Sequence, residues 1–325
     1  ILLSTYTVFD QIHFVLNKDL GFDKENIIMI RRSDALKNQM ESFKSELRKL
    51  PAVISVTNSN VYPGETFSNN AFFKEGEPTS NTYLINQAWI SFDYEKTFGF
   101  KMKEGRFFSP DFPTDSNAIV INEATVKSLG LENPIGKHIL SPRDENQVQA
   151  LTIIGVVKDF HFKSLHTPIE PAAFTFMPGN WEGVVCVKTQ EKNIQNTLNA
   201  IQNTWESFTS DYPFEYFFFE DLIKSLYKSE HRTSRVFVLF SVLSIIIAFL
   251  GLLGLISFMT EQRKKEVGIR KTFGSTSMNI VLIYCKEILK LILIASVLAW
   301  PVSYFVMNKW LQDFSYRVDI DYVMF

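Results

Sequence analysis

The sequence feature that most constrains the fold is a run of 25 consecutive residues without a charged side chain, from Val236 to Thr260. At about 1.5 Å per residue, a helix of this length would measure about 37 Å. The hydrocarbon core of a bilayer is about 30 Å thick. A core helix of a soluble protein would normally carry charge on one face over such a length. The run therefore predicts a transmembrane helix over residues 236–260.

A second apolar stretch predicts another membrane span, over residues 288–307. Lys290 lies near its start, where a lysine side chain can extend to the membrane interface. Pro301 lies inside the stretch. In a bilayer, a neighbouring helix can satisfy the carbonyl that a proline leaves free. We therefore expect a kink at Pro301 rather than a helix end.

Basic residues set the orientation of the two spans. The loop between them, residues 261–287, opens with five basic and two acidic side chains between Glu261 and Lys271. Short loops rich in lysine and arginine lie on the cytoplasmic side of a membrane. The loop is therefore expected in the cytoplasm, and residues 10–235 and 308–325 are expected outside it.

Both ends of the sequence are interpreted as neighbours of further membrane segments. Residues 1–9 are apolar or hydroxylic and lack the basic start of a signal peptide, so they are interpreted as the tail of a truncated transmembrane helix. Trp310, Phe314 and Tyr316 are typical of an interfacial aromatic belt. Residues 308–325 are interpreted as an extracytoplasmic loop that could lead into a further span.

The average composition conceals the difference between the extracytoplasmic part of the chain and the part that contains the two spans. A hydrophobic fraction of 46% and a net charge of −2 are typical of a soluble protein. However, residues 1–235 carry 24 basic and 29 acidic side chains, whereas residues 236–325 carry nine and six. No strongly basic balance supports a nucleic-acid partner. Cys186 and Cys285 fall on opposite sides of the membrane, so no disulfide is expected.

The extracytoplasmic domain contains the same pattern twice. A short apolar strand at residues 26–31 precedes a helix in which Leu36, Met40, Phe43, Leu47 and Leu50 are spaced by four and three residues, and a strand at 53–56 follows. Ser33 or Asp34 is the expected N-cap of this helix. The second copy has strands at 183–188 and 214–219 around an apolar face spanning residues 194–208. Two strand–helix–strand units predict an α+β domain whose halves are separated in the sequence.

The sequence between the two copies, residues 62–178, is rich in Phe, Pro, Gly and Asn. It predicts an inserted β-rich subdomain with four short strands, at residues 83–89, 118–121, 151–157 and 172–176. Residues 220–235 are polar and predict a helical stalk that leads into the first span. The predicted architecture is an extracytoplasmic α+β domain, residues 10–235, joined to transmembrane helices.

No motif indicates a catalytic, cofactor or metal site. Residues 130–137 resemble a phosphate-binding loop, but five residues separate the glycines and His138 stands where Ser or Thr is needed, so a turn is the better interpretation. His161 and His166 are five residues apart, which places them on different faces of a strand or a helix. We interpret residues 159–166 as a polar loop. The chain is therefore not expected to be an enzyme.

Small residues in the first span could form a helix-packing face. Ser241, Ser244, Ala248 and Gly251 fall within about 80° of one another on a helix, and small side chains allow a second span to approach closely. Ordinary lipid-facing composition is the alternative explanation.

The most specific signal is a charged segment just inside the membrane. It contains Arg263, Lys264, Lys265, Glu266, Gly268, Arg270, Lys271 and Gly274. A basic cluster that only fixes topology or touches anionic lipid is the simpler alternative. Glu266 and the two glycines do not suit a lipid anchor. After Gly274, Ser275 and Thr276 can cap an amphipathic segment that leads into the second span.

These residues make the sequence recognisable. The segment RKKEVGIRKTFGS and the later AWPVSYF closely resemble the permease subunits of MacB/FtsX-like ABC transporters. The resemblance covers nearly the whole chain, since EGRFF (104–108), INEATVKSLGLENPIGKHI (121–139), TIIGVVKDFHFKSLH (152–166) and YKSEHRTSRVF (227–237) are similar to the extracytoplasmic domain and stalk of that family.

The resemblance implies a permease subunit in the bacterial cytoplasmic (inner) membrane. Its partners would be a separate cytoplasmic ABC ATPase, the lipid bilayer, and a second permease copy or a fused second half. The charged segment would be the ATPase-coupling loop, with Glu266, Gly268, Arg270 and Gly274 at recurrent positions of the family. Ser275 departs from the family's usual alanine. Fixed charges beside glycines suit a lever between two moving bodies.

Three functions remain open at this stage. The first is mechanical transmission of ATP-driven movement to the extracytoplasmic domain, to export or extract a peptide, lipoprotein, lipid or drug. The second is an FtsX-like regulator of an extracytoplasmic cell-wall hydrolase. The third is a transmembrane sensor, which the short loop between the spans disfavours.

Overall fold

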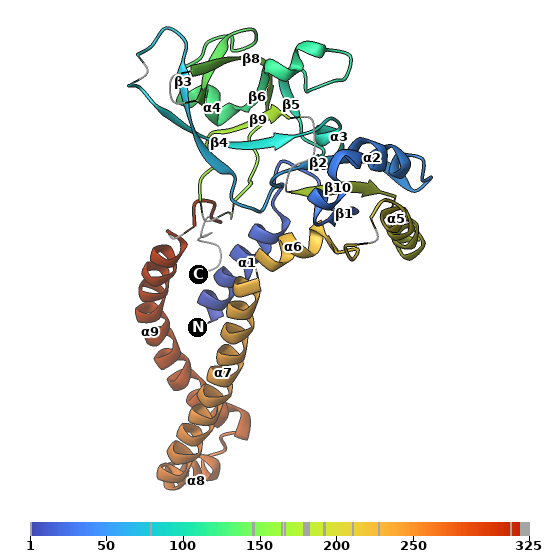
Figure 1. Cartoon of the computed structure of the whole chain (residues 1–325). Coiled ribbons are helices and arrows are strands. Elements are labelled where there is room, and N and C mark those ends of the chain that lie inside the picture. Colours follow the sequence, from blue (N-terminus) through green and yellow to red (C-terminus); the bar gives the residue numbers. More distant parts are fainter. Residues whose placement is uncertain are drawn as a thin grey trace. The chain divides into compact units, whose positions relative to one another are not determined.

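The computed structural model describes residues 2–78, 80–144, 147–163, 165, 167–177, 183–190, 193–209, 211–226, 228–312 and 314–318 (Figure 1). The chain divides into two compact units. The α+β unit comprises Lys18–Leu226, and the helical unit comprises Ile1–Asn17 together with Tyr227–Phe325. The α+β unit is therefore shorter at both ends than the expected domain of residues 10–235.

The α+β unit is built on one continuous sheet. Its strands are β1 (Ile27–Ile30), β2 (Val53–Ser59), β3 (Ser68–Lys74), β4 (Tyr83–Ile90), β5 (Met102–Gly105), β6 (Ala118–Asn122), β7 (His138–Asp144), β8 (Gln147–Val157), β9 (Ala172–Phe176), β10 (Val184–Thr189) and β11 (Tyr216–Phe218). Its helices are η1 (Ser33–Gln39), α2 (Met40–Arg48), α3 (Tyr94–Phe98), η2 (Pro113–Asn117), α4 (Glu123–Ser128), α5 (Ile194–Phe208) and α6 (Phe219–Leu226), where η denotes a 3-10 helix.

Four antiparallel strands form the first layer, in the order β11-β1-β10-β2. Helices α2 and α5 pack on this layer, and the Phe43 ring of α2 meets the Trp205 ring of α5 edge-on at 5.7 Å. Strands and helices share one hydrophobic core, because the apolar face of each helix repeats at helical spacing. Both predicted strand–helix–strand units are therefore confirmed, and their strands alternate in one sheet.

The first helix begins differently from the prediction. Residues 33–39 form the 3-10 helix η1, which is interrupted by a kink at Lys37, where φ is 46° and ψ is −125°. The N-cap of η1 is Arg32, with a φ of 57° and no side-chain cap hydrogen bond. The predicted caps, Ser33 and Asp34, are therefore wrong. The left-handed turn at Arg32 starts the helical segment instead, and Leu36 is still buried.

The inserted region closes into a six-stranded barrel. β4 pairs with β3, β3 with β7, β7 with β8, β8 with β6 and β6 with β9, and β9 pairs with β4 to complete the ring. Small barrels fill their interior with side chains. The residues that do so here are Phe72, Ile85, Ile119, Ile121, Ile139, Leu151, Ile153, Val156 and Ala173. Val126 of α4 and Leu129 pack against the same core, near the end where β6 finishes.

The four strands predicted in the insert are confirmed as β4, β6, β8 and β9. Strands β3, β5 and β7 were not predicted. β3 begins with Ser68-Asn69-Asn70 and β7 contains Pro142, so neither has the alternating or continuous apolar pattern of a strand. The barrel also shares a sheet with the first layer, through the pair Ser59 and Ile90.

An aromatic cluster fills the space between the first layer and the barrel. Ring centroids lie 4.7 to 6.2 Å apart in the pairs Tyr94–Phe98, Phe100–Phe160, Phe98–Phe219 and Phe22–Phe100. Phe160 and Phe162 come from the predicted polar loop, residues 159–166, and both are buried. That prediction is therefore wrong for its aromatic residues, because they pack into this cluster. His166 lies outside the described residues.

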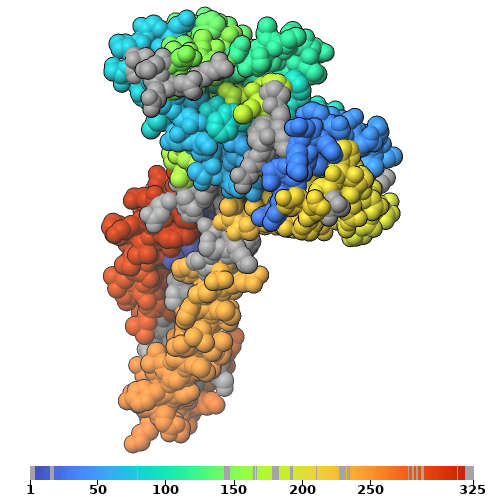
Figure 2. Space-filling view, viewed as in Figure 1, coloured from blue at the N-terminus to red at the C-terminus, as the bar shows by residue number. Residues whose placement is uncertain are grey.

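The helical unit contains α1 (Leu2–Asn17), α7 (Lys228–Gln262), α8 (Lys264–Thr272) and α9 (Ser277–Leu311) in its described part. Two segments are long and apolar enough to cross a membrane, Arg235–Gln262 and Leu289–Leu311. They overlap the two predicted spans, and α9 continues through Pro301 without ending. The apolar side chains of α7 are mostly exposed, and Figure 2 shows much of its surface uncovered (orange).

Two predicted boundaries change. α1 continues to Asn17, so the predicted tail at residues 1–9 ends too early. Val8 and Ile12 lie one turn apart on α1 and pack with Met307, so the apolar face continues past Asp10. The predicted stalk at residues 220–235 is also divided, because α6 ends at Leu226 and buries Ile223 within the α+β unit.

The residues after Met307 lie against α1. Gln11 is fully buried, its Nε2 donates to the Tyr316 carbonyl at 2.8 Å, and its Oε1 accepts from the Val318 amide at 2.8 Å. The Trp310 and Phe314 rings meet edge-on at 4.9 Å, and Phe314 is buried. The predicted interfacial belt is therefore partly covered by protein, because a turn after α9 brings these residues onto α1.

Candidate functional site

The charged segment between the two candidate spans is a helix rather than a loop. α7 ends at Gln262, α8 covers Lys264–Thr272, and α9 begins at Ser277. Most of the predicted coupling loop, residues 261–287, is therefore helical. Lysine, glutamate and arginine, which favour helices, supply five of the nine residues of α8. The ion pairs Glu261–Lys264 and Glu266–Arg270 join positions three and four apart.

The end of α8 is closed by a Schellman motif. Gly274 has a φ of 86°, a left-handed conformation that glycine adopts at little cost. Its amide donates to the Lys271 carbonyl at 3.1 Å, and the Ser275 amide donates to the Arg270 carbonyl at 3.0 Å. Thr276 then caps α9 by accepting from the Asn279 amide. The left-handed turn at the end of α8 therefore explains the glycine at position 274. Of the two predicted caps of the next helix, Ser275 and Thr276, Thr276 is confirmed.

The side chains of α8 present charge and apolar surface together. Arg270 Nη2 donates to Glu266 Oε1 at 2.6 Å, and both side chains are partly exposed. Lys265, Lys271 and Gly268 are exposed. Ile269 and Phe273 are also exposed, at 58% and 86%. Sequence reasoning identified the charges but missed these two apolar residues, which could have been found as hydrophobic positions inside a charged helix.

The predicted helix-packing face on α7 is only partly covered. Ser241 is buried, and its Oγ hydrogen-bonds Thr5 Oγ1 of α1. Ser244 is half-buried and donates to the Phe240 carbonyl at 2.8 Å. Ala248 and Gly251 are exposed. Packing of Ala248 and Gly251 against another span therefore stays a prediction.

The motifs that sequence analysis set aside have structural explanations. Gly130, Asn133 and Gly136 all have positive φ, so residues 130–137 form turns that lead into β7. Burial, together with the Lys18 ammonium, lowers the pKa of His161 to about 4. The described residues contain no group of three or more His, Cys, Asp or Glu placed to hold a metal ion.

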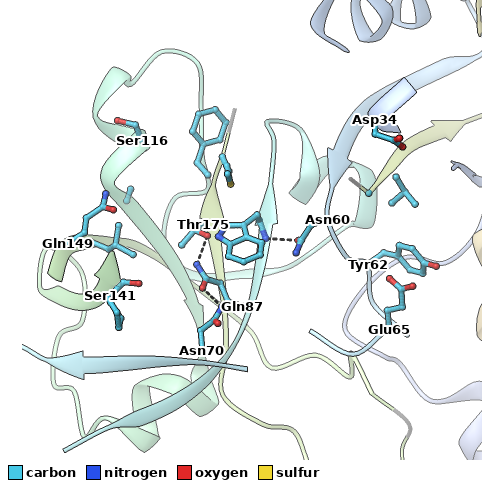
Figure 3. Close-up of a pocket in the computed structure, with 18 of the residues that line it drawn as sticks. Asp34, Asn60, Tyr62, Glu65, Asn70, Gln87, Ser116, Ser141, Gln149 and Thr175 are labelled. Atoms are coloured by element: carbon cyan, nitrogen blue, oxygen red, sulfur yellow. Dashed lines mark hydrogen bonds between the residues drawn. The ribbon is translucent and has the colours of Figure 1, made fainter. Parts of the chain in front are cut away.

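A large open cavity lies at one end of the barrel, with a volume of about 1190 Å³ (Figure 3). All six ring strands contribute to its lining, which the first layer completes. The lining residues are Arg31, Arg32, Asp34, Asn60, Tyr62, Glu65, Asn70, Ala71, Gln87, Trp89, Ser116, Ala118, Ser141, Pro142, Gln149, Leu151, Thr175, Phe176, Met177, Gly183 and Val184. We call this cavity the barrel mouth. It lies at the start of β6, opposite the end where α4 follows that strand.

Polar side chains at the barrel mouth are connected by hydrogen bonds. Asn70 Nδ2 donates to Gln87 Oε1 at 2.7 Å, and Gln87 Nε2 donates to Thr175 Oγ1 at 2.8 Å, as Figure 3 shows. Burial and the Glu65 carboxylate raise the pKa of Tyr62, so its hydroxyl stays protonated. No local pattern indicated this cavity, because its lining comes from nine short segments spread between Arg31 and Val184.

An ion pair between the partly exposed Arg106 and the buried Asp115 holds the rim of the barrel mouth next to Ser116. Asp115 is 1% exposed and accepts two hydrogen bonds from the Arg106 guanidinium, at 2.7 and 2.6 Å, and one from the Ser109 amide at 3.0 Å. Burial alone would raise the pKa of Asp115, but these hydrogen bonds and the Arg106 charge outweigh it and lower that pKa. The rim is therefore anchored by a bidentate pair.

Comparison with known proteins matches both units to one family. The MacB-like periplasmic core domain family matches residues 13–205, and the FtsX-like permease C-terminal family matches residues 238–324. The first match alone covers more than half of the chain. This chain belongs to the MacB/FtsX-like permease family.

Curated relatives agree with this membership. The macrolide export ATP-binding/permease protein MacB of Aggregatibacter actinomycetemcomitans is 25% identical over 285 residues, which are 82% of this chain and 41% of that protein. The protein of the same name from Neisseria gonorrhoeae is 23% identical over 257 residues, 74% of this chain and 38% of its own. The chain therefore spans about two fifths of the length of these relatives.

Two solved structures are similar to part of this chain. The periplasmic region of MacB from Actinobacillus actinomycetemcomitans matches with a TM-score of 0.46 and 19% identity, over 65% of this chain and 97% of that one. A domain of a putative permease from Porphyromonas gingivalis matches with a TM-score of 0.43 and 16% identity, over 58% and 87%.

Family membership assigns the two units their general roles. The MacB-like match covers β1 to the C-terminal part of α5, so the α+β unit is the periplasmic domain of a membrane permease. The FtsX-like match covers α7, α8 and α9, the part with both candidate membrane spans. Members of this family are the permease components of ABC transporters.

Proposed function

We propose that this chain transmits ATP-driven movement from a cytoplasmic ABC ATPase to its periplasmic domain, in order to export or extract a substrate such as a peptide, lipoprotein, lipid or drug. The observation that carries the proposal is α8, a short charged helix between the two candidate spans with exposed Ile269 and Phe273. The proposal places ATP hydrolysis in an ATPase outside these 325 residues. A second permease copy, or a fused half, would complete the assembly in the bacterial inner membrane.

The geometry of α8 suits the transfer of force. The Glu266–Arg270 ion pair stabilises the helix, and the Schellman motif at Gly274 fixes the direction in which the chain leaves it. Thr276 starts α9 two residues later, so little flexible chain separates the two helices. A displacement of α8 would therefore be passed to α9 rather than absorbed by a loop.

Docking of α8 on an ATPase can be separated from its internal stability. The variants E266K and R270E each remove the ion pair and reverse one charge. The double variant Glu266→Arg with Arg270→Glu keeps an ion pair but reverses both charges. If α8 binds an ATPase, all three variants should reduce co-purification of an ABC ATPase from native membranes at least about tenfold, because a like-charge contact across an interface costs several kcal/mol.

The matched control lies in the α+β unit. Lys224 and Glu220 of α6 form the same type of pair, at 2.7 Å and four positions apart. Reversal with E220K should leave both membrane abundance and co-purification unchanged. Recovery of co-purification in the double variant would show that the single variants acted through helix stability. Unchanged co-purification in all variants would refute the docking role of α8.

A further inference from the structure

The barrel is not closed along its whole length. β3 and β7 pair only through Phe73 with Leu140 and Lys74 with Ile139. Before Phe73, β3 pairs with β4 on one side, and after Leu140, β7 pairs with β8 on one side. Among the described residues no strand pairs with the other edge of either segment. The two strands therefore separate at the barrel mouth.

These two edges border the cavity directly. Asn70 and Ala71 of β3 line it on one side, and Ser141 and Pro142 of β7 line it on the other. A strand edge presents unpaired backbone N–H and C=O groups, which can pair with another extended chain. Pro142 has no backbone N–H, and proline is found at strand edges for that reason. The wall of the cavity is thus a strand edge rather than a surface made of side chains alone.

The side chains around the cavity match the chemistry of a polypeptide. Asn70, Gln87 and Gln149 carry amide groups, which can both donate to and accept from a peptide backbone. Two cations, Arg31 and Arg32, are balanced by two anions, Asp34 and Glu65. The barrel mouth therefore offers amides and charges of both signs.

Other ligand classes fit less well. A phosphate-bearing or nucleic-acid ligand would require an excess of positive charge, which the barrel mouth does not have. A lipid chain or an apolar drug could use the apolar part of the lining, but it would leave the backbone groups of both strand edges unpaired. A carbohydrate could use Trp89 and the amides, but it would leave the backbone groups of both edges unpaired.

We propose that the barrel mouth binds an extended polypeptide segment, which adds to the free edge of β3 as an extra strand. Main-chain hydrogen bonds would supply the affinity, and side-chain pockets towards Trp89 and Phe176 would supply specificity. The segment belongs to a transported polypeptide, so naming it as cargo rests on the proposed function. The inference goes beyond ATPase coupling and uses different residues, so either proposal can fail without the other.

The experiment uses the full chain in lipid nanodiscs and three probes. The first is a fluorescein-labelled mixture of random-sequence dodecapeptides. The second is the same mixture with every backbone nitrogen methylated, which removes the N–H donors of both strand edges and therefore those on which strand addition depends. The third is an unlabelled mixture of maltotetraose and chitotetraose as competitor. We expect saturable binding of the first probe by anisotropy, at least tenfold weaker binding of the second, and no competition by the third.

Two matched variants place the binding at the barrel mouth. Ser116→Trp puts a large ring on the exposed rim beside the anchored Asp115, and should weaken binding at least tenfold. Ser128→Trp makes the same change on exposed α4, near the opposite end of the barrel, and should leave binding unchanged. A further variant, Asn70→Leu, should weaken binding without added bulk, because it removes the donor to Gln87.

Several results would overturn this inference. They are absence of saturable peptide binding, equal binding of the methylated mixture, equal effects of the two tryptophan variants, and competition by the oligosaccharides. Co-purification of the ATPase should be unchanged in Ser116→Trp, so a negative result here would leave the proposed function standing. Ser116→Trp cells should retain more peptide cargo than wild-type cells. Unchanged cargo together with loss of a periplasmic binding partner would assign the barrel mouth to that partner and overturn the transported segment.

Discussion

The two units use the same apolar residue types in opposite ways. In the α+β unit the largest side chains are buried, and Trp205, Tyr94 and Phe43 are at 0% exposure. In the helical unit Leu239, Val297 and Phe305 are between 65% and 72% exposed. The α+β unit therefore has a core that water can drive together, whereas the exposed surface of the helical unit needs a different solvent. That surface is the property of a chain that lies in lipid.

Polar contacts also have different roles in the two units. In the α+β unit, buried polar side chains such as Ser55 and Thr97 satisfy each other inside an apolar core. In the helical unit, polar contacts connect α1 to its neighbours, through Ser4 to Ser303 of α9 and through Gln11 to the Tyr316 carbonyl. Because lipid does not drive apolar helix surfaces together, packing and interhelical hydrogen bonds hold membrane helices in place. The comparison predicts which substitutions each unit will tolerate.

The largest effect is expected for Trp205→Ala. The Trp205 ring contacts Phe43 edge-on, and its Nε1 donates to the Tyr212 carbonyl at 3.1 Å. Removing this ring should lower the free energy of unfolding of the α+β unit by about 3–5 kcal/mol. Urea denaturation measures this loss, with hydrogen exchange of the β1 and β10 amides as the readout of unfolding.

Trp310→Ala is the matched substitution in the helical unit. Trp310 is partly buried, and its loss should cost about 1 kcal/mol or less in the stability of that unit, because lipid can replace the apolar contacts that the ring loses. Equal costs for Trp205 and Trp310 would contradict the division into a water-driven core and a lipid-exposed bundle.

The second prediction places the same charge on exposed leucines of both units. Leu250 on α7 and Leu84 on β4 are both 60% exposed. Leu250→Arg should lose about 2.5–3.5 kcal/mol of insertion free energy, because the arginine would lie inside the bilayer. Leu84→Arg should change stability by about 0.5 kcal/mol at most, because the side chain lies in water. Membrane abundance reports the first effect and thermal unfolding the second.

If Leu250→Arg accumulated in the membrane at the wild-type level, α7 would not be a lipid-exposed span. If Leu84→Arg strongly lowered the thermal stability of the α+β unit, the exposed surface at Leu84 would belong to an interface. Either result would remove the contrast in solvent between the units.

Local patterns predicted the elements that bury a regular apolar face. The spacing of Leu36, Met40 and Phe43 indicated the first helix, and the apolar run at β8 indicated a strand, because both patterns follow from the period of the element. The charged segment at α8 was recognised by its charges and by its resemblance to a family rather than by a period, and it was expected as a loop. A glycine directly after a basic helical stretch, as at Gly274, is a known helix-end signal and could have indicated that α8 is a helix.

Long-range closure could not be predicted in this way. The barrel depends on the pairing of β4 with β9, which are distant in the sequence, and no local pattern specifies that pairing. Residues that line the barrel mouth also made two strands of the barrel, β3 and β7, difficult to recognise from the sequence. Asn70 in β3 and Ser141 in β7 are polar because they line the cavity, and they interrupt the apolar alternation that identifies a strand.

The third prediction concerns the pH dependence of the α+β unit. Burial and the Lys18 ammonium hold the pKa of His161 at about 4, against 6.5 in the unfolded chain. Between these values the unfolded chain binds a proton that the folded unit does not, so stability falls as the pH falls from 6.5 to 4. We expect a loss of about 1–2 kcal/mol over this range, after allowance for solvent screening.

The variant His161→Gln should remove this loss, and urea midpoints at pH 7 and pH 4.5 measure it. Carboxylates such as Asp115, whose pKa is lowered, give up their stabilisation below about pH 4, the unfolded value. In His161→Gln, the loss of stability that these carboxylates cause below about pH 4 should therefore remain. An unchanged slope between pH 6.5 and 4 in His161→Gln would mean that other groups cause it.

The smallest effect tests the polar contacts of the two units against each other. Ser4 Oγ and Ser303 Oγ lie 3.0 Å apart between α1 and α9, and Ser55 Oγ and Thr97 Oγ1 lie 2.9 Å apart inside the α+β unit. Double-mutant cycles with Ser→Ala and Thr→Val should give about 0.6 kcal/mol for the helical pair and about 1 kcal/mol for the buried pair. The helical pair is worth less because α1 can find other partners in the membrane when that contact is lost. A coupling above about 2 kcal/mol for Ser4 and Ser303 would exceed the range observed between membrane helices, and would show that α1 is held to α9 as tightly as a core element.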